Sequence, residues 1–257
     1  FGLGRFFNRF LAPLPVFAWT NLYYYFLLRP KSTRSVVELK KVSVIVPARN
    51  EEGNIKNAIT RMPKLADHVE VIFVEGNSTD QTWEKIQQVQ SEPHPAWMSI
   101  KSFKQTAKGK ANAVHKGFEN ATGDLLMILD ADLTVQPEEL PRFVQPMRDG
   151  TCDFCHGSRL IYPMDKEAMR FLNQLGNKAF SVLFTYLLDQ KFKDTLCGTK
   201  VFWRKDWERI KAVRDHYFGD FDPFGDFEML FGAVKLNIKV LQIPVDYKER
   251  TYGETNI

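Results

Sequence analysis

Residues 125–132 read Leu-Leu-Met-Ile-Leu-Asp-Ala-Asp, an apolar run that ends in two carboxylates separated by one residue. Five consecutive apolar residues are typical of a strand that is buried on both faces, as in a parallel sheet covered by helices. We therefore predict a strand over residues 125–129, with Asp130 and Asp132 on the turn that follows it.

Segments of strand length alternate with segments of helical period on the N-terminal side of this run. The expected strands there cover residues 42–46, 69–74 and 99–103, and the expected helices cover residues 55–62, 82–90 (capped by Asp80) and 110–120. The second half is less regular, and its expected elements are one long or two short helices over 166–188, strands over 201–203 and 238–245, and a helix over 227–235. This alternation predicts an α/β fold, an αβα sandwich with a mostly parallel central sheet.

Composition limits the class of protein. The chain has 257 residues, of which 44% are hydrophobic, so it can bury the core of one large domain, which we place at residues 41–257. The net charge of +4 suits anionic ligands or an anionic membrane surface and is too small to indicate nucleic-acid binding. Three cysteines give no disulfide framework and fit a reducing compartment. Cys152 and Cys155 form a CxxC without a second pair, which favours two half-buried thiols on a strand over a structural metal.

Residues 1–40 differ from the rest and form an aromatic and basic N-terminal segment. Residues 10–28 carry no charge, but Pro13 and Pro15 interrupt any helix there. We favour a segment that lies at a membrane interface or packs on the domain; a linker from an upstream domain and a true membrane span are the alternatives. The start at Phe1, without a signal-peptide cleavage pattern, leads us to expect a fragment or a processed form.

The two aspartates of the 130–132 turn are the strongest chemical signal. Mg²⁺ or Mn²⁺ prefers such oxygen ligands and completes its shell with substrate phosphates, so that it can neutralise a departing diphosphate. The alternative is a turn in which Asp130 and Asp132 accept hydrogen bonds from backbone amides. The position of the pair after a buried strand, level with the other polar loops, favours the metal site.

Two further loops follow strands at the same predicted edge of the sheet. Residues 47–52 join a strand to a helix, where a nucleotide can meet backbone amides; a capped helix start explains them equally well. In the next loop we expect Glu75 to hold a base or ribose. Lys108 and Lys110 add positive charge before a helix, although a solvated turn is an equal alternative.

Taken together, eight pieces of the sequence resemble glycosyltransferase family 2, and within it the dolichyl-phosphate mannose synthase branch. They are VSVIVPARNEEGNI, VIFVEGNSTDQTW, KGKANAVHKGF, ATGDLLMILDADL, GSR at residues 157–159, DTLCGTKVF, DFEML and YKERTYGETNI. The resemblance covers about residues 42–257 and implies the GT-A fold.

The resemblance also implies site residues. For the nucleotide it implies contacts from Pro47, Ala48, Arg49, Glu51, Glu75 and Asp80, to which we add Lys110 and Asp130. It implies a metal site at Asp130 and Asp132, with Arg159, Lys200 and Arg250 around the acceptor phosphate and the donor diphosphate. The expected partners are a nucleotide-sugar donor, a polyprenyl phosphate acceptor and the cytoplasmic face of a membrane.

Three departures from the family pattern bear on these expectations. Thr134 stands where the synthases commonly have a Gln, which affects the third metal ligand. The SGFR-like motif reads CGTK, and Lys200 keeps the charge of an arginine without its bidentate geometry. The helices that usually follow the YGES-like motif are not in the chain, and some bacterial relatives carry this domain behind a methyltransferase domain.

The expected reaction is an inverting displacement at the anomeric carbon, with Asp132 as the metal-binding catalytic residue. A phosphate acceptor is already ionised at neutral pH and needs cations to orient it, whereas a sugar hydroxyl needs a general base. Asp226 or Glu228 could supply that base or orient the acceptor, although acidic residues at a helix start also have a purely structural explanation. The rival functions are transfer to a glycan hydroxyl, nucleotidyl transfer and an inactive nucleotide-sugar-binding module.

Overall fold

The computed structural model describes residues 4, 6–12, 38–160, 171–188, 190–217, 225–250 and 252–253. The chain divides into two compact units, Phe1–Thr33 and Arg34–Ile257. The described part of the first unit holds a short π-helix, η1 (Phe7–Leu11), and exposes the rings of Phe6, Phe7 and Phe10. None of the helices in the described ranges combines the length and the apolar character that a membrane span requires.

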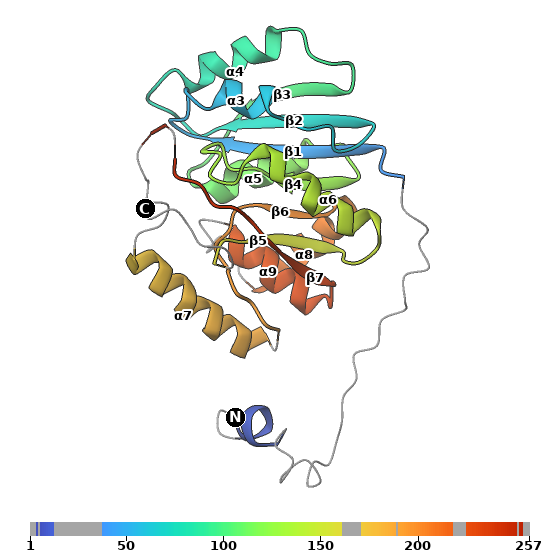
Figure 1. The fold of residues 1–257 in the computed structure, drawn as a ribbon, viewed down its shortest axis with the longest axis vertical. Helices are drawn as coiled ribbons and strands as arrows, with labels where there is room; N and C mark the ends of the chain where they lie inside the picture. The colour runs from blue at the N-terminus through green and yellow to red at the C-terminus, as the bar shows by residue number, and fades with distance from the viewer. Residues whose placement is uncertain are drawn as a thin grey trace. The chain divides into compact units, whose positions relative to one another are not determined.

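The second unit is built on one sheet, in which the described residues form seven strands in the order β3-β2-β1-β4-β6-β5-β7 (Figure 1). The strands are β1 (Lys41–Ala48), β2 (His68–Glu75), β3 (Met98–Lys104), β4 (Leu125–Ile128), β5 (Phe154–Ser158), β6 (Lys200–Trp203) and β7 (Val240–Pro244). All pairings are parallel except those of β6, which runs antiparallel to both β4 and β5. Because β6 is reversed, its first residue, Lys200, lies at the edge where the other strands end.

Helices cover both faces of this sheet. They are α3 (Ile55–Thr60), α4 (Thr82–Ser91), α5 (Lys110–Glu119), α6 (Pro141–Arg148), α7 (Phe171–Leu188), α8 (Arg204–Tyr217) and α9 (Asp226–Lys235), with a 3₁₀ turn, η2, at Pro137–Glu139. Alternate strand residues enter two separate cores: Val44 packs with α3, α4 and α6, while Ile45 packs with α5, α8 and α9. Gly117 of α5 lies so close to Ile45 that a Cβ atom there would approach its Cγ2 to 2.4 Å.

The predicted α/β sandwich is confirmed, and each expected strand and helix is present to within a few residues. The expected helix over 166–188 begins at Phe171 in the structure, and residues 166–170 lie outside the described ranges. Helices α6 and α8 were not predicted from the sequence, and no bounds were predicted for β5. Two prolines lie within α6 and a strongly polar run forms α8, while β5 reads Phe-Cys-His-Gly-Ser, so none of the three shows the expected apolar pattern.

Cys152 and Cys155 are fully buried, not half-buried as predicted. Their Sγ atoms lie 3.0 Å apart, and the Cys152 sulfur also lies 3.6 Å from that of Met147. Cys155 belongs to β5, and Cys152 precedes this strand. The two thiols therefore act as small apolar groups of the core, on the side packed by α6.

Candidate active site

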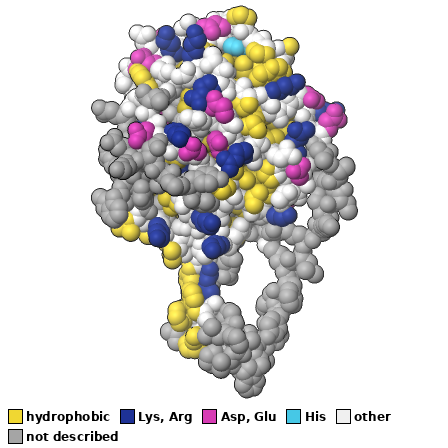
Figure 2. All heavy atoms as spheres, viewed as in Figure 1, with side chains coloured by type: hydrophobic (Ala, Val, Ile, Leu, Met, Phe, Trp, Pro, Cys, Tyr) yellow, Lys and Arg dark blue, Asp and Glu magenta, His cyan; other side chains and the backbone are white. Residues whose placement is uncertain are grey.

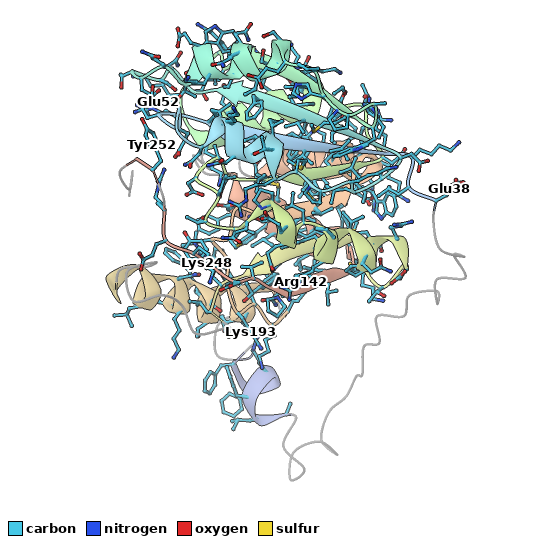
Figure 3. The ribbon with its side chains drawn as sticks, turned by 45° about the horizontal axis from the view of Figure 1, so that its top comes forward. Glu38, Glu52, Arg142, Lys193, Lys248 and Tyr252 are labelled. Carbon is cyan, nitrogen blue, oxygen red and sulfur yellow. The ribbon has the colours of Figure 1, made fainter. Side chains whose placement is uncertain are left out.

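The candidate site lies where β1, β2, β4, β5 and β7 end and β6 begins. Parallel strands bring the loops that follow them to one edge of a sheet, and this edge is where α/β proteins bind ligands. Figure 3 shows Glu52 and Tyr252 next to each other at this edge and Glu38 at the opposite one. Figure 2 shows basic and acidic side chains interspersed over one face of the molecule.

The two aspartates on the turn after β4 have different surroundings. Asp130 Oδ1 lies 2.6 Å from Lys110 Nζ, and each side chain keeps 28% exposure, so the pair can meet a ligand. Asp132 Oδ1 accepts hydrogen bonds from the amide (3.1 Å) and hydroxyl (2.9 Å) of Thr134. Asp132 Oδ2 lies 3.9 Å from Arg250 Nη1, at the limit of an ion pair. The predicted alternative, in which the aspartates accept hydrogen bonds within their own turn, therefore holds for Asp132 Oδ1. Asp132 Oδ2 faces the site.

The pKa values of Asp130 and Asp132 are shifted in opposite directions. Burial and then the neighbouring Asp130 charge raise the pKa of Asp132 above its ordinary value. Burial opposes the ionised form of Asp130 as well, but Lys110, with smaller contributions from Lys200 and Arg159, outweighs it and lowers the pKa of Asp130. The pKa of Lys110 is raised, since Asp130 and Asp226 outweigh the effect of its burial. A cation placed between the two carboxylates would relieve their repulsion.

Asp130 and Asp132 could supply part of the coordination shell of a divalent metal. Two carboxylates on one turn offer the hard oxygens that Mg²⁺ or Mn²⁺ prefers. The described ranges contain no cluster of three or more His, Cys, Asp or Glu side chains that could hold an ion. Thr134, which stands at the position of the third ligand, is bonded to Asp132 instead. An ion held here would therefore need phosphate or water oxygens to complete its shell.

The loops after β1 and β2 hold one another in place. Asn50 Oδ1 accepts from the Thr79 amide at 2.8 Å, and Asn50 itself has a positive φ of 55°. The Glu75 carboxylate accepts from the Ser78 amide, so it shapes its own turn. Asp80 Oδ1 accepts from the Thr82 amide at 3.0 Å and caps α4 as predicted. The backbone of this site is thus fixed before any ligand binds.

The other residues expected at the nucleotide differ in exposure. Ala48 is buried, and its carbonyl accepts from the Gly76 amide at 2.8 Å. Arg49 is exposed at the rim, and Pro47 is half-buried. Glu51 is buried with its carboxylate on Asn54 Nδ2, at 2.8 Å, and on Arg250 Nη2. Burial raises the pKa of Glu51 to about 7 in spite of these two donors.

Each of the three predicted acceptor cations is paired with a buried carboxylate. Arg159 Nε and Nη2 form a fork with Asp194, at 2.8 and 2.9 Å. Arg250 pairs with Glu51, so it is not a solvated residue. Tyr252, two residues further on, donates its hydroxyl to Glu52 Oε1 at 2.9 Å. Figure 3 shows these two residues next to each other.

Lys200 is fully buried and donates to the Cys197 carbonyl at 2.6 Å and to Asp226. The intervening Gly198 lies directly against the aspartate turn, since a Cβ atom there would come within 2.0 Å of Asp130 Oδ2 and 2.5 Å of Lys110 Nζ. The CGTK motif and the 130–132 turn therefore form one compact arrangement in which positive and negative side chains alternate.

The two acidic residues at the start of α9 point to different partners. Asp226 reaches Lys200 and, at longer range, contributes to the raised pKa of Lys110. Glu228 is 2% exposed and pairs with His115 and, at 3.3 Å, with Arg214 Nε. Only Asp226 therefore belongs to the charged arrangement around the aspartate turn.

Several residues of the site were not singled out from the sequence. Asp194 is fully buried and also accepts from Asn177 Nδ2 at 2.7 Å. The Arg159 guanidinium carbon lies 5.2 Å from the ring centre of Tyr247. Gly53 packs so closely on Tyr252 that a Cβ atom would meet its ring at 2.5 Å. The DTLCGTKVF and YKERTYGETNI pieces contained Asp194, Tyr247 and Tyr252, but nothing local in the sequence marked Asn177.

The chain is similar in sequence to several known glycosyltransferases. Dolichol-phosphate mannosyltransferase of Pyrococcus furiosus is 28% identical over 221 residues, which are 84% of this chain and 59% of that protein. Undecaprenyl-phosphate 4-deoxy-4-formamido-L-arabinose transferase of Photorhabdus laumondii is 32% identical over 225 residues, with coverage of 86% and 64%. Glycosyltransferase AglD of Haloferax volcanii is 29% identical, with coverage of 84% and 34%. The chain thus spans between a third and two thirds of the length of these relatives.

Solved structures share the fold. Glucosyl-3-phosphoglycerate synthase of Mycobacterium tuberculosis, in complex with Mn²⁺, uridine diphosphate and glucosyl-3-phosphoglycerate, has a TM-score of 0.56 at 17% identity, covering 84% of this chain and 73% of that one. Residues 1–349 of TarS from S. aureus give 0.52 at 18% identity, with coverage of 82% and 60%. At such identities the likeness shows the fold alone, and it confirms the GT-A expectation. The sequence profile described as Glycosyl transferase family 2 matches residues 43–210, more than half of the chain, which therefore belongs to glycosyl transferase family 2.

Proposed function

We propose that this chain transfers a sugar, with inversion, from a nucleotide-sugar to a polyprenyl phosphate at a membrane surface. The observation that carries the proposal is the arrangement of Arg159, Lys200 and Arg250 around the 130–132 turn. Two of the relatives are named for transfer to dolichol phosphate and undecaprenyl phosphate, which supports the same acceptor class.

The donor would bind over the loops after β1 and β2. In our proposal residues 47–51, Glu75, Asp80 and Lys110 contact the nucleotide, while Asp132 and Asp130 hold Mg²⁺ or Mn²⁺. The bound ion would offset the charge of the diphosphate as it leaves. Structural neighbours crystallised with Mn²⁺ or Mg²⁺ and uridine diphosphate make this cofactor class reasonable. Lys110, already beside Asp130, is placed to offset further phosphate charge.

A phosphate acceptor would need cations to orient it and no general base. A monophosphate is largely ionised near pH 7, because its second pKa is about 6. Its approach to a diphosphate has to be offset by fixed positive charge, which Arg159, Lys200 and Arg250 supply. Asp226 is held by Lys200, and Glu228 by His115 and Arg214, so neither carboxylate is placed as an unengaged general base.

A membrane surface is the proposed partner because of helix α7. Its outward face is apolar, with Leu175 56% exposed and Val182 68% exposed. The exposed charged residues that the structure describes along α7 and residues 190–193 are all basic: Lys178, Lys191 and Lys193. An apolar face bordered by lysines suits an anionic lipid surface, and we place it at the cytoplasmic leaflet, which is negatively charged. In the first unit, the exposed Phe6, Phe7 and Phe10 have the same chemistry.

The test is a transfer assay on the chain with Mg²⁺ or Mn²⁺, a panel of GDP- and UDP-sugars and three acceptors: a short polyprenyl phosphate, the matching polyprenol and a glycan. We expect transfer to the polyprenyl phosphate with the best donor. Better transfer to the polyprenol or glycan would overturn the lipid-phosphate assignment and bring Asp226 forward as a base. Pyrophosphate release would indicate a nucleotidyltransferase, and donor binding without turnover would indicate an inactive module.

A further inference from the structure

Helix α7 has two polar side chains on its inward stripe and several large apolar side chains on its outward face. Asn177 and Ser181 are buried, at 1% and 6% exposure, together with Phe184. These three residues are spaced by four and three, so they share one stripe of the helix. Leu175 and Val182 lie on the opposite face and are exposed. A surface helix normally has the reverse pattern, so the inward polar residues call for a role of their own.

The inward residues bind the segment that precedes the CGTK motif. Ser181 Oγ donates to the Phe192 carbonyl, and the Phe192 amide donates to Thr185 Oγ1 at 3.0 Å. Asn177 uses both ends of its amide: Oδ1 accepts from the Thr195 amide at 3.3 Å, and Nδ2 donates to Asp194 Oδ1 at 2.7 Å. Of these inward residues, Asn177 is therefore the one seen to contact a charged group.

Asp194 connects Asn177 to Arg159, one of the cations proposed to bind the acceptor. Its Oδ2 accepts from the Arg159 amide at 2.9 Å and from Arg159 Nε at 2.8 Å, while Oδ1 accepts from Arg159 Nη2 at 2.9 Å. A guanidinium is planar, so fixing Nε and Nη2 fixes the direction of every other N–H group. The Leu196 amide also donates to Asp194 Oδ1, at 3.0 Å. The orientation of Arg159 thus depends on how Asp194 is held.

We propose that Asn177 is a positioning residue of the acceptor site: it holds the Asp194 carboxylate and, through it, the plane of the Arg159 guanidinium. This inference rests on the proposed function, in which Arg159 binds the acceptor phosphate. It also links the helix with the lipid-facing apolar surface to the group that binds a lipid phosphate.

The experiment compares Asn177→Ala with Ser181→Ala, using steady-state kinetics with a nucleotide-sugar and a short polyprenyl phosphate. Asn177→Ala loses the contacts to Asp194 and Thr195, and Ser181→Ala loses the contact to the Phe192 carbonyl, but only the Asn177 contacts lead to Arg159. We expect Asn177→Ala to raise the KM for the acceptor about tenfold, the scale of one lost hydrogen bond to a charged group, with the KM for the donor unchanged. Ser181→Ala should leave both KM values unchanged while lowering Tm to a similar degree.

Two further variants keep the test decisive. In an Asp194→Asn background, Asn177→Ala should add little to the acceptor KM, because residues that act through one another are not additive. If Asn177→Ala does not fold, Asn177→Ser gives the same comparison with a shorter polar group. Equal acceptor KM values in wild type and Asn177→Ala, or equal increases in Asn177→Ala and Ser181→Ala, would overturn the inference alone. A wild-type chain that uses only glycans or alcohols as acceptors would overturn the inference together with the proposed function.

Discussion

At the scale of single residues, the site is a set of opposite charges held out of water. Asp130 is paired with Lys110, Asp226 with Lys200, and Glu51 with Arg250. A buried ion pair adds little net stability, but removing one partner leaves an uncompensated charge, which costs several kcal/mol. Substitutions here therefore have two separable effects, one on the reaction and one on folding.

Asp132→Asn should abolish sugar transfer without harming the fold. The change removes a negative charge that Asp130 repels, so Tm should stay the same or rise, whereas the shift of Tm caused by Mn²⁺ should disappear. We expect turnover to fall by at least about 100-fold, as when other groups that stabilise transition-state charge are removed. Thermal unfolding with and without Mn²⁺, beside the transfer assay, checks both parts. Full wild-type activity in excess chelator would contradict the metal role.

Lys200→Ala should destabilise the protein so strongly that its kinetics cannot be interpreted on their own. The reason is that the substitution leaves the Asp226 carboxylate buried and unpaired. The expected loss is about 3–5 kcal/mol in the free energy of unfolding. The double variant Lys200→Ala/Asp226→Ala should recover part of this loss, since both charges are gone. Urea unfolding of the two single variants and the double variant measures the coupling. Additive losses would show that the Lys200–Asp226 pair is not a coupled unit.

At the scale of elements, the two faces of α7 have different roles. The inward face holds the 192–195 segment, and the outward face is left to meet another surface. In Figure 1, α7 lies apart from the strands, which fits a helix attached through the one stripe that holds Asn177, Ser181 and Phe184. Phe184 joins it to α9 by edge-on ring contacts with Phe227 and Phe231, at 5.0 Å each.

Val182→Asp should weaken binding to vesicles that contain anionic lipid, because it places a negative charge in the middle of the apolar face. Sedimentation with vesicles of neutral and anionic lipid measures the partition. Gln88→Asp is the matched control, since it puts the same charge on an exposed position of α4. Transfer to a short, soluble acceptor should change little in either variant. Equal vesicle binding by Val182→Asp and Gln88→Asp would remove α7 from the proposed membrane contact.

At the scale of the whole molecule, a buried carboxylate joins the elements at the edge opposite the site. Glu70 of β2 accepts from Ser43 Oγ of β1 and from the Thr122 amide, at 2.9 Å, just before β4. It also pairs with Lys41 at 3.2 Å and with Lys101 of β3 at 2.7 Å. Burial alone would raise the pKa of Glu70, but these donors together lower it to about 2.

The low pKa of Glu70 predicts that the fold weakens in acid. A carboxylate with a lowered folded-state pKa stabilises the protein above its unfolded-state value of about 4.3, and the stabilisation is lost as pH falls toward 2. Glu70→Gln should therefore be less stable than wild type at pH 7, and the difference should shrink between about pH 4.3 and 2. Urea unfolding at several pH values measures it. A difference that stays constant with pH would show that the charge of Glu70 is not what stabilises the sheet.

The sequence by itself determined the first half of the sheet and the place of the aspartate turn. The runs in β1, β2 and β4 are buried and apolar, and the turns after them carry their own polar residues, so local pattern is enough to fix them. Asp80 capping α4 belongs to the same class, because the cap and the helix start lie two residues apart. Such features depend on neighbours in the chain.

Only the tertiary structure decided which charges meet. Arg159 pairs with Asp194, 35 positions away, and Arg250 pairs with Glu51, 199 positions away. The reversal of β6, which carries Lys200 to the site edge, and the inward position of Asn177 on α7 are equally invisible to local pattern. The physical reason is that a charge is paired by whatever the fold brings within a few ångströms, and burial in the assembled core makes that pairing obligatory.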